Sequence, residues 1–283
     1  MILSIGLMLS VGYGIFISKR SITIEHLNIS FKSLPKQLDG LTLMHISDFH
    51  LGSFKNDATL RKCARKMNEL KPDIILFTGD MVNNFSEEII GKELALKEMD
   101  AKYGKYAIYG NHDYGDYSNW DSPAEKMKNF EQVTKHITDA DFIMLDNANV
   151  KLQVNDTCLY IIGVQNWGYA PFPQYADLEK ATRNIPEQSF KILLTHDPAH
   201  WEVEVTKNTT IPLTLSGHTH AGQLGIKISG IAFSPMYFIE HLWNGLYSSG
   251  EQKLYVNRGL GCVGFPGRIE MTPEITLITL KKE

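Results

Sequence analysis

The chain has 283 residues, and its 28 basic and 32 acidic side chains give a net charge of −4. This length suffices for one sizeable α/β domain with its own core. The mildly acidic balance offers no general attraction for nucleic acid, so we expect no nucleic-acid partner. The three cysteines are widely spaced and form no C-x-x-C pair, which argues against a disulfide framework.

The first eighteen residues differ in composition from the rest. Residues 1–18 carry no charged side chain, and Lys19 and Arg20 follow them. As a helix this run spans about 27 Å, just enough to cross a bilayer. It lacks the flanking residues of a cleaved signal peptide. We therefore expect a transmembrane helix, single-pass or the last of a longer membrane region. By the positive-inside tendency, the following domain would face the cytoplasm from the cell membrane.

Strand and helix patterns then alternate along the chain. Residues 19–40 read as a linker that enters as an edge strand, because apolar residues nearly alternate there. Residues 56–70, 86–101 and 123–140 have helical spacing, the last with Ser122 as its cap. Residues 150–165 and 253–280 have β patterns. We expect an α/β fold of two stacked mixed sheets flanked by helices, with residues 41–283 forming one catalytic domain.

Five short apolar runs end in side chains that bind metals. The runs and the residues after them are 41–47 with Asp48 and His50, 74–79 with Asp80, 106–110 with Asn111 and His112, 191–195 with His196, and 211–217 with His218 and His220. Such runs are typical of central strands of a sheet covered on both faces. Ligands in α/β sheets gather beyond the carboxyl ends of these strands. The repeated pattern therefore indicates one metal-dependent site.

The residue types narrow the chemistry of that site. Carboxylate, amide and imidazole groups suit Mn, Fe or Zn better than Ca. None of the five segments contains a cysteine, which argues against a closed thiolate zinc site. Two metals roughly 3.5–4 Å apart activate a water and stabilise an in-line displacement at phosphorus. Gly79, Gly110 and Gly217 each precede a proposed ligand, where the backbone must turn close to the ions.

The order Asp-x-His, Gly-Asp, Gly-Asn-His-Asp, His, Gly-His-Thr-His resembles the calcineurin-like metallophosphoesterases. The likeness runs from about Leu41 to the C-terminus. Residues 47–52, 217–223, 258–261, 268–269 and 273–275 are similar to a membrane-associated bacterial branch of that family. This branch includes UDP-2,3-diacylglucosamine pyrophosphatases. The resemblance implies an αββα sandwich with the metals at one end.

The resemblance also implies roles for the residues, and two divalent ions as cofactors, with Mn preferred and Fe or Zn as alternatives. Asp48, His50 and His220 would hold one ion, Asn111, His196 and His218 the other, and Asp80 would bridge them. A bridging hydroxide would attack the phosphoryl group. His112 would protonate the leaving alkoxide or stabilise its charge. Asp113 would orient His112, or else be a loop carboxylate facing water.

The expected substrate is a phosphate ester or pyrophosphate, of a small molecule or a lipid. Aromatic residues gather in three expected loops, 114–120, 167–173 and 233–243. Beside a membrane helix such loops would suit lipid, so UDP-2,3-diacylglucosamine is a concrete candidate. Arg258 and Arg268 either neutralise substrate phosphates or are surface arginines. The alternatives are a broad-specificity phosphodiesterase or nuclease on soluble substrates, or a non-catalytic metal-binding scaffold.

Overall fold

Two six-stranded mixed sheets form the centre of the protein, in a computed structural model that describes residues 2–169, 173–228 and 231–283. The first sheet has the order β1-β14-β2-β3-β4-β5, with β1 (Thr23–Phe31), β14 (Glu274–Lys282), β2 (Thr42–Ile46), β3 (Ile74–Phe77), β4 (Lys105–Ala107) and β5 (Phe142–Met144). The second has the order β12-β13-β9-β8-β7-β6, with β12 (Gly245–Ser249), β13 (Gln252–Val256), β9 (Leu213–Ser216), β8 (Phe190–Leu194), β7 (Thr157–Gly163) and β6 (Ala148–Val154). A separate hairpin joins β10 (Ile226–Ile228) to β11 (Ile231–Phe233).

The strands that precede the expected ligands lie side by side and parallel. In the first sheet β2, β3, β4 and β5 are parallel, while β14 runs antiparallel to β2. In the second sheet β7, β8, β9 and β13 are parallel, and the edge strands β6 and β12 are antiparallel to their neighbours. The carboxyl ends of β2, β3 and β4 therefore open at one edge of their sheet, and those of β8 and β9 at one edge of theirs.

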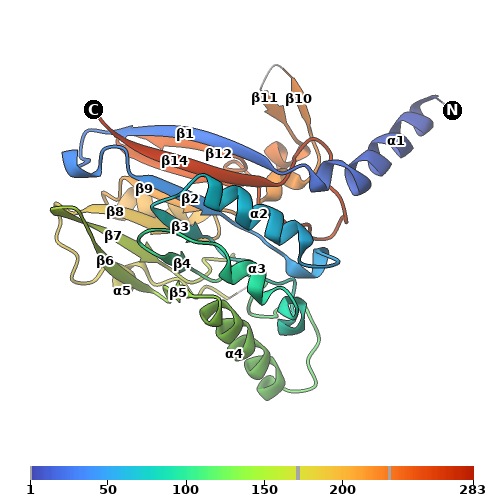
Figure 1. The fold of residues 1–283 in the computed structure, drawn as a ribbon, viewed down its shortest axis with the longest axis horizontal. Helices are drawn as coiled ribbons and strands as arrows, with labels where there is room; N and C mark the ends of the chain where they lie inside the picture. The colour runs from blue at the N-terminus through green and yellow to red at the C-terminus, as the bar shows by residue number, and fades with distance from the viewer. Residues whose placement is uncertain (1, 170–172, 229–230) are drawn as a thin grey trace.

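Helices cover the outer faces of the sheets (Figure 1). They are α2 (Ala58–Glu69), α3 (Glu93–Lys97), α4 (Pro123–Asp139), α5 (Leu178–Thr182) and α6 (Thr206–Asn208), the last following a helical segment at Trp201–Val205. Helix α1 (Ile2–Phe16) instead projects away from the sheets (Figure 1). The predicted architecture of two mixed sheets flanked by helices is confirmed.

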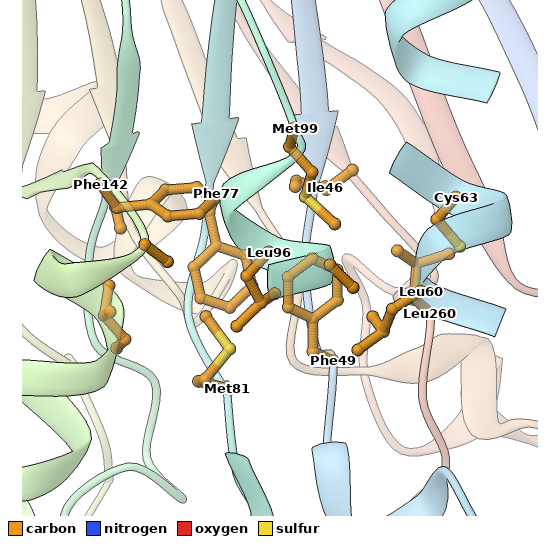
Figure 2. Packing of buried hydrophobic residues seen from close by; sticks show 14 of the residues in the cluster. Ile46, Phe49, Leu60, Cys63, Phe77, Met81, Leu96, Met99, Phe142 and Leu260 are labelled. Carbon is orange, nitrogen blue, oxygen red and sulfur yellow. The ribbon is translucent and has the colours of Figure 1, made fainter. Parts of the chain in front are cut away.

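Three apolar layers hold these elements together. One lies between α2, α3, α4 and the first sheet, and there the rings of Phe49 and Phe77 stack with centroids 4.9 Å apart (Figure 2). A second fills the space between the two sheets, and a third lies on the outer face of the second sheet. Cys63 is buried in the first layer on α2, together with Leu60 and Met67 of the same helix.

The expected helices are only partly as predicted. Residues 56–70 and 123–140 form α2 and α4, and the hydroxyl of Ser122 accepts a hydrogen bond from the Glu125 amide at 3.2 Å. The single helix predicted for residues 86–101 is instead a 3₁₀ turn, Ser86–Ile89, followed by α3. Gly91 separates them with a φ of 79°, which a right-handed helix cannot contain.

The predicted transmembrane helix is wrong. Helix α1 forms within the expected segment, but it has 15 residues, which span about 22 Å against a hydrocarbon core of about 30 Å. Among the residues that the structure describes, no helix is long and apolar enough to cross a membrane. The cell-membrane location and the cytoplasm-facing orientation rested on that helix and are corrected with it. Met1, the first residue of the predicted segment, lies outside the described residues.

The ends of β3 and β4 pass unusually close to each other. Gly79 has a φ of 94°, and a Cβ built on it would lie 2.7 Å from the carbonyl carbon of Tyr109. Gly40 has a similar φ of 87°, but a Cβ there would meet no atom within 4 Å. The two glycines thus share a left-handed backbone and differ in crowding.

This pair yields a matched prediction. Gly40→Ala should lower the free energy of unfolding by about 1–2 kcal/mol, because an L-residue is strained at positive φ. Gly79→Ala should lower it by about 1–3 kcal/mol more, because the added methyl group forces the strand ends apart. Urea unfolding of both variants measures the difference. Equal losses would show that the close approach at Gly79 does not constrain the fold.

Candidate metal centre

Five strand ends deliver the candidate residues to one place. Asp48 and His50 follow β2, Asp80 follows β3, Asn111 follows β4, His196 follows β8, and His218 and His220 follow β9. Backbone hydrogen bonds join these loops: the Asp48 amide donates to Gly79 O at 2.9 Å, and the Gly217 amide to His196 O at 3.1 Å. The His218 amide donates to the Asp48 carboxylate at 3.1 Å and so connects the two sheets.

The backbone of the candidate ligands is strained. Asp48, His50, Asp80, His218 and His220 all have positive φ, between 41° and 72°. Non-glycine residues rarely adopt this conformation. Each residue held in it costs about 1–3 kcal/mol, and the conformation persists only where the surrounding structure imposes it. Strain of this kind clusters at functional sites. Sequence patterns did not indicate it, since no residue type in these segments demands it.

The first cluster consists of Asp48, His50 and His220. Nε2 of His220 lies 3.0 Å from Nε2 of His50 and 3.4 Å from Oδ1 of Asp48. All three residues are buried. Their donor atoms lie close enough to one another to hold a single ion.

The second cluster surrounds His196. Its Nε2 lies 3.2 Å from Oδ2 of Asp80 and 3.3 Å from Nδ1 of His218, which in turn lies 2.9 Å from Oδ1 of Asn111. The Thr78 carbonyl accepts a hydrogen bond from Nδ1 of His196 at 2.7 Å, so Nδ1 carries a proton and Nε2 is the ring nitrogen that faces the cluster. The seven residues expected as ligands are therefore brought together.

Asp80 lies between the two clusters. Its Oδ2 is 3.2 Å from His196 and also 3.4 Å from Nε2 of His50, while its Oδ1 accepts a hydrogen bond from the His112 amide at 2.9 Å. Asp80 is almost completely buried. A single carboxylate thus faces both groups of histidines.

Burial and mutual attraction set the protonation of this centre. Burial opposes the charged form of Asp80, but His196 outweighs it and lowers the pKa of the carboxyl well below its usual value. Burial likewise opposes protonation of His196, and Asp80 overcomes it and raises the pKa of that histidine to about 10. Burial, together with His50 and Arg268, lowers the pKa of His220 well below normal.

The donor set fits divalent transition-metal ions. Four imidazoles, two carboxylates and one amide oxygen converge here, and none is a soft thiolate. Nitrogen atoms 3.0 Å apart, as in His50 and His220, have lone pairs that repel unless a proton or a cation lies between them. A shared cation resolves this crowding, and mixed nitrogen and oxygen ligands suit Mn, Fe or Zn.

His112 lies beside the clusters. Nδ1 of its ring donates to Asn83 O at 2.7 Å, and its ring stacks on Tyr117 with centroids 4.4 Å apart. Burial lowers the pKa of His112, with Asp80 opposing. The hydroxyl of Tyr117 accepts a hydrogen bond from Nδ2 of Asn111 at 2.9 Å, which turns the amide oxygen of Asn111 toward His218. Sequence patterns had placed Tyr117 only in a possible substrate wall.

Asp113 contacts the backbone rather than the His112 ring. Its carboxylate accepts hydrogen bonds from the amides of Asp80, Met81, Val82 and Gly110, at 2.8–3.2 Å. Among the described residues, no hydrogen bond joins it to the ring of His112, whose Nδ1 is bonded to Asn83 O. Asp113 is fully buried, so the alternative of a loop carboxylate facing water does not hold. It joins the loops after β3 and β4.

Both arginines of the C-terminal segment are buried. Arg258 forms ion pairs with Glu25 at 2.9 Å and Glu274 at 3.0 Å. Arg268 is fully buried, and its Nη2 donates to Nδ1 of His220 at 3.0 Å. Neither is a surface arginine, and the contact of Arg268 with a candidate ligand was not expected from sequence.

The comparisons with known proteins agree with this geometry. The pattern of the family described as calcineurin-like phosphoesterase matches residues 41–222. An uncharacterized metallophosphoesterase, YkuE of Bacillus subtilis, is 32% identical over 279 residues, covering 95% of this chain and 89% of that protein. The chain therefore belongs to the calcineurin-like phosphoesterase family, and membership implies hydrolysis of phosphoesters.

Two further likenesses are more distant. The UDP-2,3-diacylglucosamine pyrophosphatase LpxG of Chlamydia muridarum is 28% identical over 275 residues, covering 81% of each chain. The solved structure of the NAD nucleotidase NadN of Haemophilus influenzae superposes with a TM-score of 0.52 at 13% identity. It covers 79% of this chain and 46% of that one, and shows a shared fold.

Proposed function

We propose that this protein is a divalent-metal-dependent hydrolase of a phosphate ester or pyrophosphate. The observation that carries the proposal is the position of Asp80, whose Oδ2 lies within 3.4 Å of both His50 and His196. One ion would be held by Asp48, His50 and His220, the other by Asn111, His196 and His218, with Asp80 shared. Two such ions, when bound, lower the pKa of water and neutralise charge on phosphoryl oxygens. Manganese is the first candidate, with iron or zinc as alternatives.

His112 supplies the proton in this proposal. Its Nδ1 is held by Asn83 O, so Nε2 is the position that remains for donating a proton to a leaving alkoxide. Its lowered pKa is that of the metal-free protein. Asp113 acts as a positioning residue, because it fixes the loops that carry Asp80 and His112.

The test of the proposed function is hydrolysis of a chromogenic phosphodiester with added Mn²⁺. Asp80→Asn should lower the rate at least about 100-fold, because even an outer-shell partner of a metal site typically contributes 10–100-fold. Asp156→Asn, in the exposed turn between β6 and β7, is the control and should leave the rate unchanged. Equal rates in wild type and Asp80→Asn would refute the shared carboxylate. A wild type that binds Mn²⁺ but cleaves no diester or pyrophosphate would favour the scaffold alternative.

The proposed role of His112 predicts a loss of turnover that depends on the leaving group. His112→Ala should retain the metals but slow turnover by about 10²–10⁴-fold for poor leaving groups. It should have little effect for activated ones, whose departure needs no proton. Asp113→Asn should instead lower the free energy of unfolding by about 1.5–3 kcal/mol. It should also lower the rates for all leaving groups by the same factor. A flat dependence on leaving-group pKa in His112→Ala would remove this histidine from proton transfer.

We further propose a lipid pyrophosphate of the UDP-2,3-diacylglucosamine type as substrate. The name of the relative LpxG supports this class. A second support is an apolar strip beside the centre, defined as Ile226, Ile228, Phe233, Tyr237, Phe238 and Ile239. Each of these side chains is more than half exposed. Acyl chains would cover such a surface.

The strip follows His220 closely in the sequence, and one hydrogen bond connects its segment to the residue after His220. It begins six residues after His220, and the hydroxyl of Ser234 donates to Ala221 O at 2.9 Å. At its other end, burial and then Asp197 raise the pKa of Glu240, with His218 opposing. Of the other expected aromatic walls, Trp167 stacks on His200, and residues 170–172 lie outside the described residues.

Kinetics of the acylated substrate test this assignment. Phe238→Ser should raise KM for UDP-2,3-diacylglucosamine by about tenfold, because the variant loses the binding free energy that partial burial of one aromatic ring against an acyl chain provides. It should leave KM for a soluble phosphodiester unchanged. Leu94→Ser is the control, because Leu94 is also an exposed apolar residue, on α3, at 67% against 87% for Phe238. If UDP-sugars with and without acyl chains are cleaved equally well, the lipid assignment fails.

A further inference from the structure

The side chain of Arg268 is enclosed at the back of the first cluster. It lies in the segment between β13 and β14 and has no exposed surface. Its Nε donates to Gly261 O at 2.9 Å, its Nη1 to Met271 O at 3.1 Å, and its Nη2 to Arg258 O at 2.8 Å and Gly261 O at 2.7 Å. Every donor nitrogen of the guanidinium is therefore satisfied.

Its acceptors are unusual for a buried cation. They are backbone carbonyls, one imidazole nitrogen and the thiol of Cys262, and among the described residues no ion pair joins Arg268 to a carboxylate. Burying a charge without an opposite charge in contact is costly, even when its hydrogen bonds are satisfied. A neutral apolar side chain would fill this space at lower cost. Stability alone therefore does not explain Arg268.

The imidazole nitrogen belongs to His220. A guanidinium has no lone pair to offer, so Nδ1 of His220 must accept from Nη2, at 3.0 Å. The two hydrogens of Nη2 are shared among this nitrogen and the carbonyls of Arg258 and Gly261. This contact points the opposite nitrogen, Nε2, toward Asp48 and His50.

The same guanidinium holds the loop behind the other two members of this cluster. Arg258 and Gly261, whose carbonyls it binds, flank a turn that lies against Asp48: the Gly261 amide donates to Asp48 O at 2.8 Å. A Cβ on Gly261 would lie 2.8 Å from Cβ of His50. Arg268 thus contacts His220 directly and supports Asp48 and His50 through one turn.

The second cluster is held by other groups. Thr78 O fixes His196, Tyr117 fixes Asn111, and Asp113 fixes the loop of Asp80. Among the described residues, no hydrogen bond or ion pair joins Arg268 to these groups. Its support is confined to one of the two clusters.

We propose that Arg268 is a positioning residue for one of two metal sites, the site formed by Asp48, His50 and His220. This inference rests on the proposed function, because it presupposes that the two clusters bind metal. Removing the guanidinium should weaken the first site and leave the second intact. The protein should then hold one metal ion where the wild type holds two.

Metal content tests this without reference to activity. Metal-stripped protein is titrated with Mn²⁺ by calorimetry, and bound Mn²⁺ is counted after gel filtration. Electron paramagnetic resonance distinguishes a spin-coupled pair of ions from a single one. Wild type should bind two ions, and Arg268→Gln should bind one tightly and the other at least tenfold more weakly, with loss of the coupled signal.

Arg258→Gln is the matched control. It also removes a buried guanidinium from the same segment, but among the described residues this guanidinium forms ion pairs with Glu25 and Glu274 and with no candidate ligand. The carbonyl of Arg258, which belongs to the supporting turn, is kept in the variant. It should lower the melting temperature and still bind two ions. If Arg258→Gln loses an ion as Arg268→Gln does, general loosening of the segment explains the effect and the proposal is overturned.

The remaining outcomes separate the two proposals. A wild type that binds fewer than two ions contradicts the proposed dinuclear centre itself. A wild type and a folded Arg268→Gln that both bind two ions with equal affinity contradict only the role of Arg268. If Arg268→Gln does not fold, Arg268→Lys decides, because lysine retains the charge but cannot donate as a fork. Weaker binding of one ion by Arg268→Lys supports the proposal, and wild-type affinity for both overturns it.

Discussion

The buried carboxylate of Asp80 is the charge on which the rest of the centre depends. It sits at the end of β3 with one oxygen facing His50 and His196 and the other accepting the His112 amide. A carboxylate buried this deeply requires positive partners, and the surrounding histidines supply them in the metal-free protein. Divalent cations would satisfy the same requirement more completely. The buried negative charge of Asp80 thus accounts both for its histidine partners and for the metal binding that we propose.

Placing that carboxylate requires the chain to accept strain. Asp80 and four other candidate ligands adopt left-handed backbone, and Gly79 and Gly110 let the ends of β3 and β4 meet. The four backbone amides bound by Asp113 hold these turns in place. The cores between the sheets and under α2 to α4 supply the stability that offsets the strain.

Different residues outside the candidate ligands hold each of the two clusters in position. Thr78 O, Tyr117 and Asp113 hold the residues around His196, and Arg268 with the Arg258–Gly261 turn holds those around His220. The loops from the two sheets meet where the His218 amide donates to Asp48. A centre built from both sheets therefore depends on the stacking of those sheets, and no single loop forms it alone.

The strands, α2, α4 and the convergence of seven side chains could be predicted from sequence, because each rests on local periodicity and on the rule that parallel strands present their carboxyl ends together. The break at Gly91 was missed, since a single glycine does not reveal its φ. The spanning helix was wrong because composition showed an apolar run but not that α1 ends at Phe16. The partners of Arg268, Asp113 and Tyr117 could not be predicted, because burial and partners come from segments distant in sequence. Sequence alone thus determined which side chains are candidate metal ligands. Only the tertiary structure decided which groups hold these side chains in position, because those contacts form when the two sheets pack.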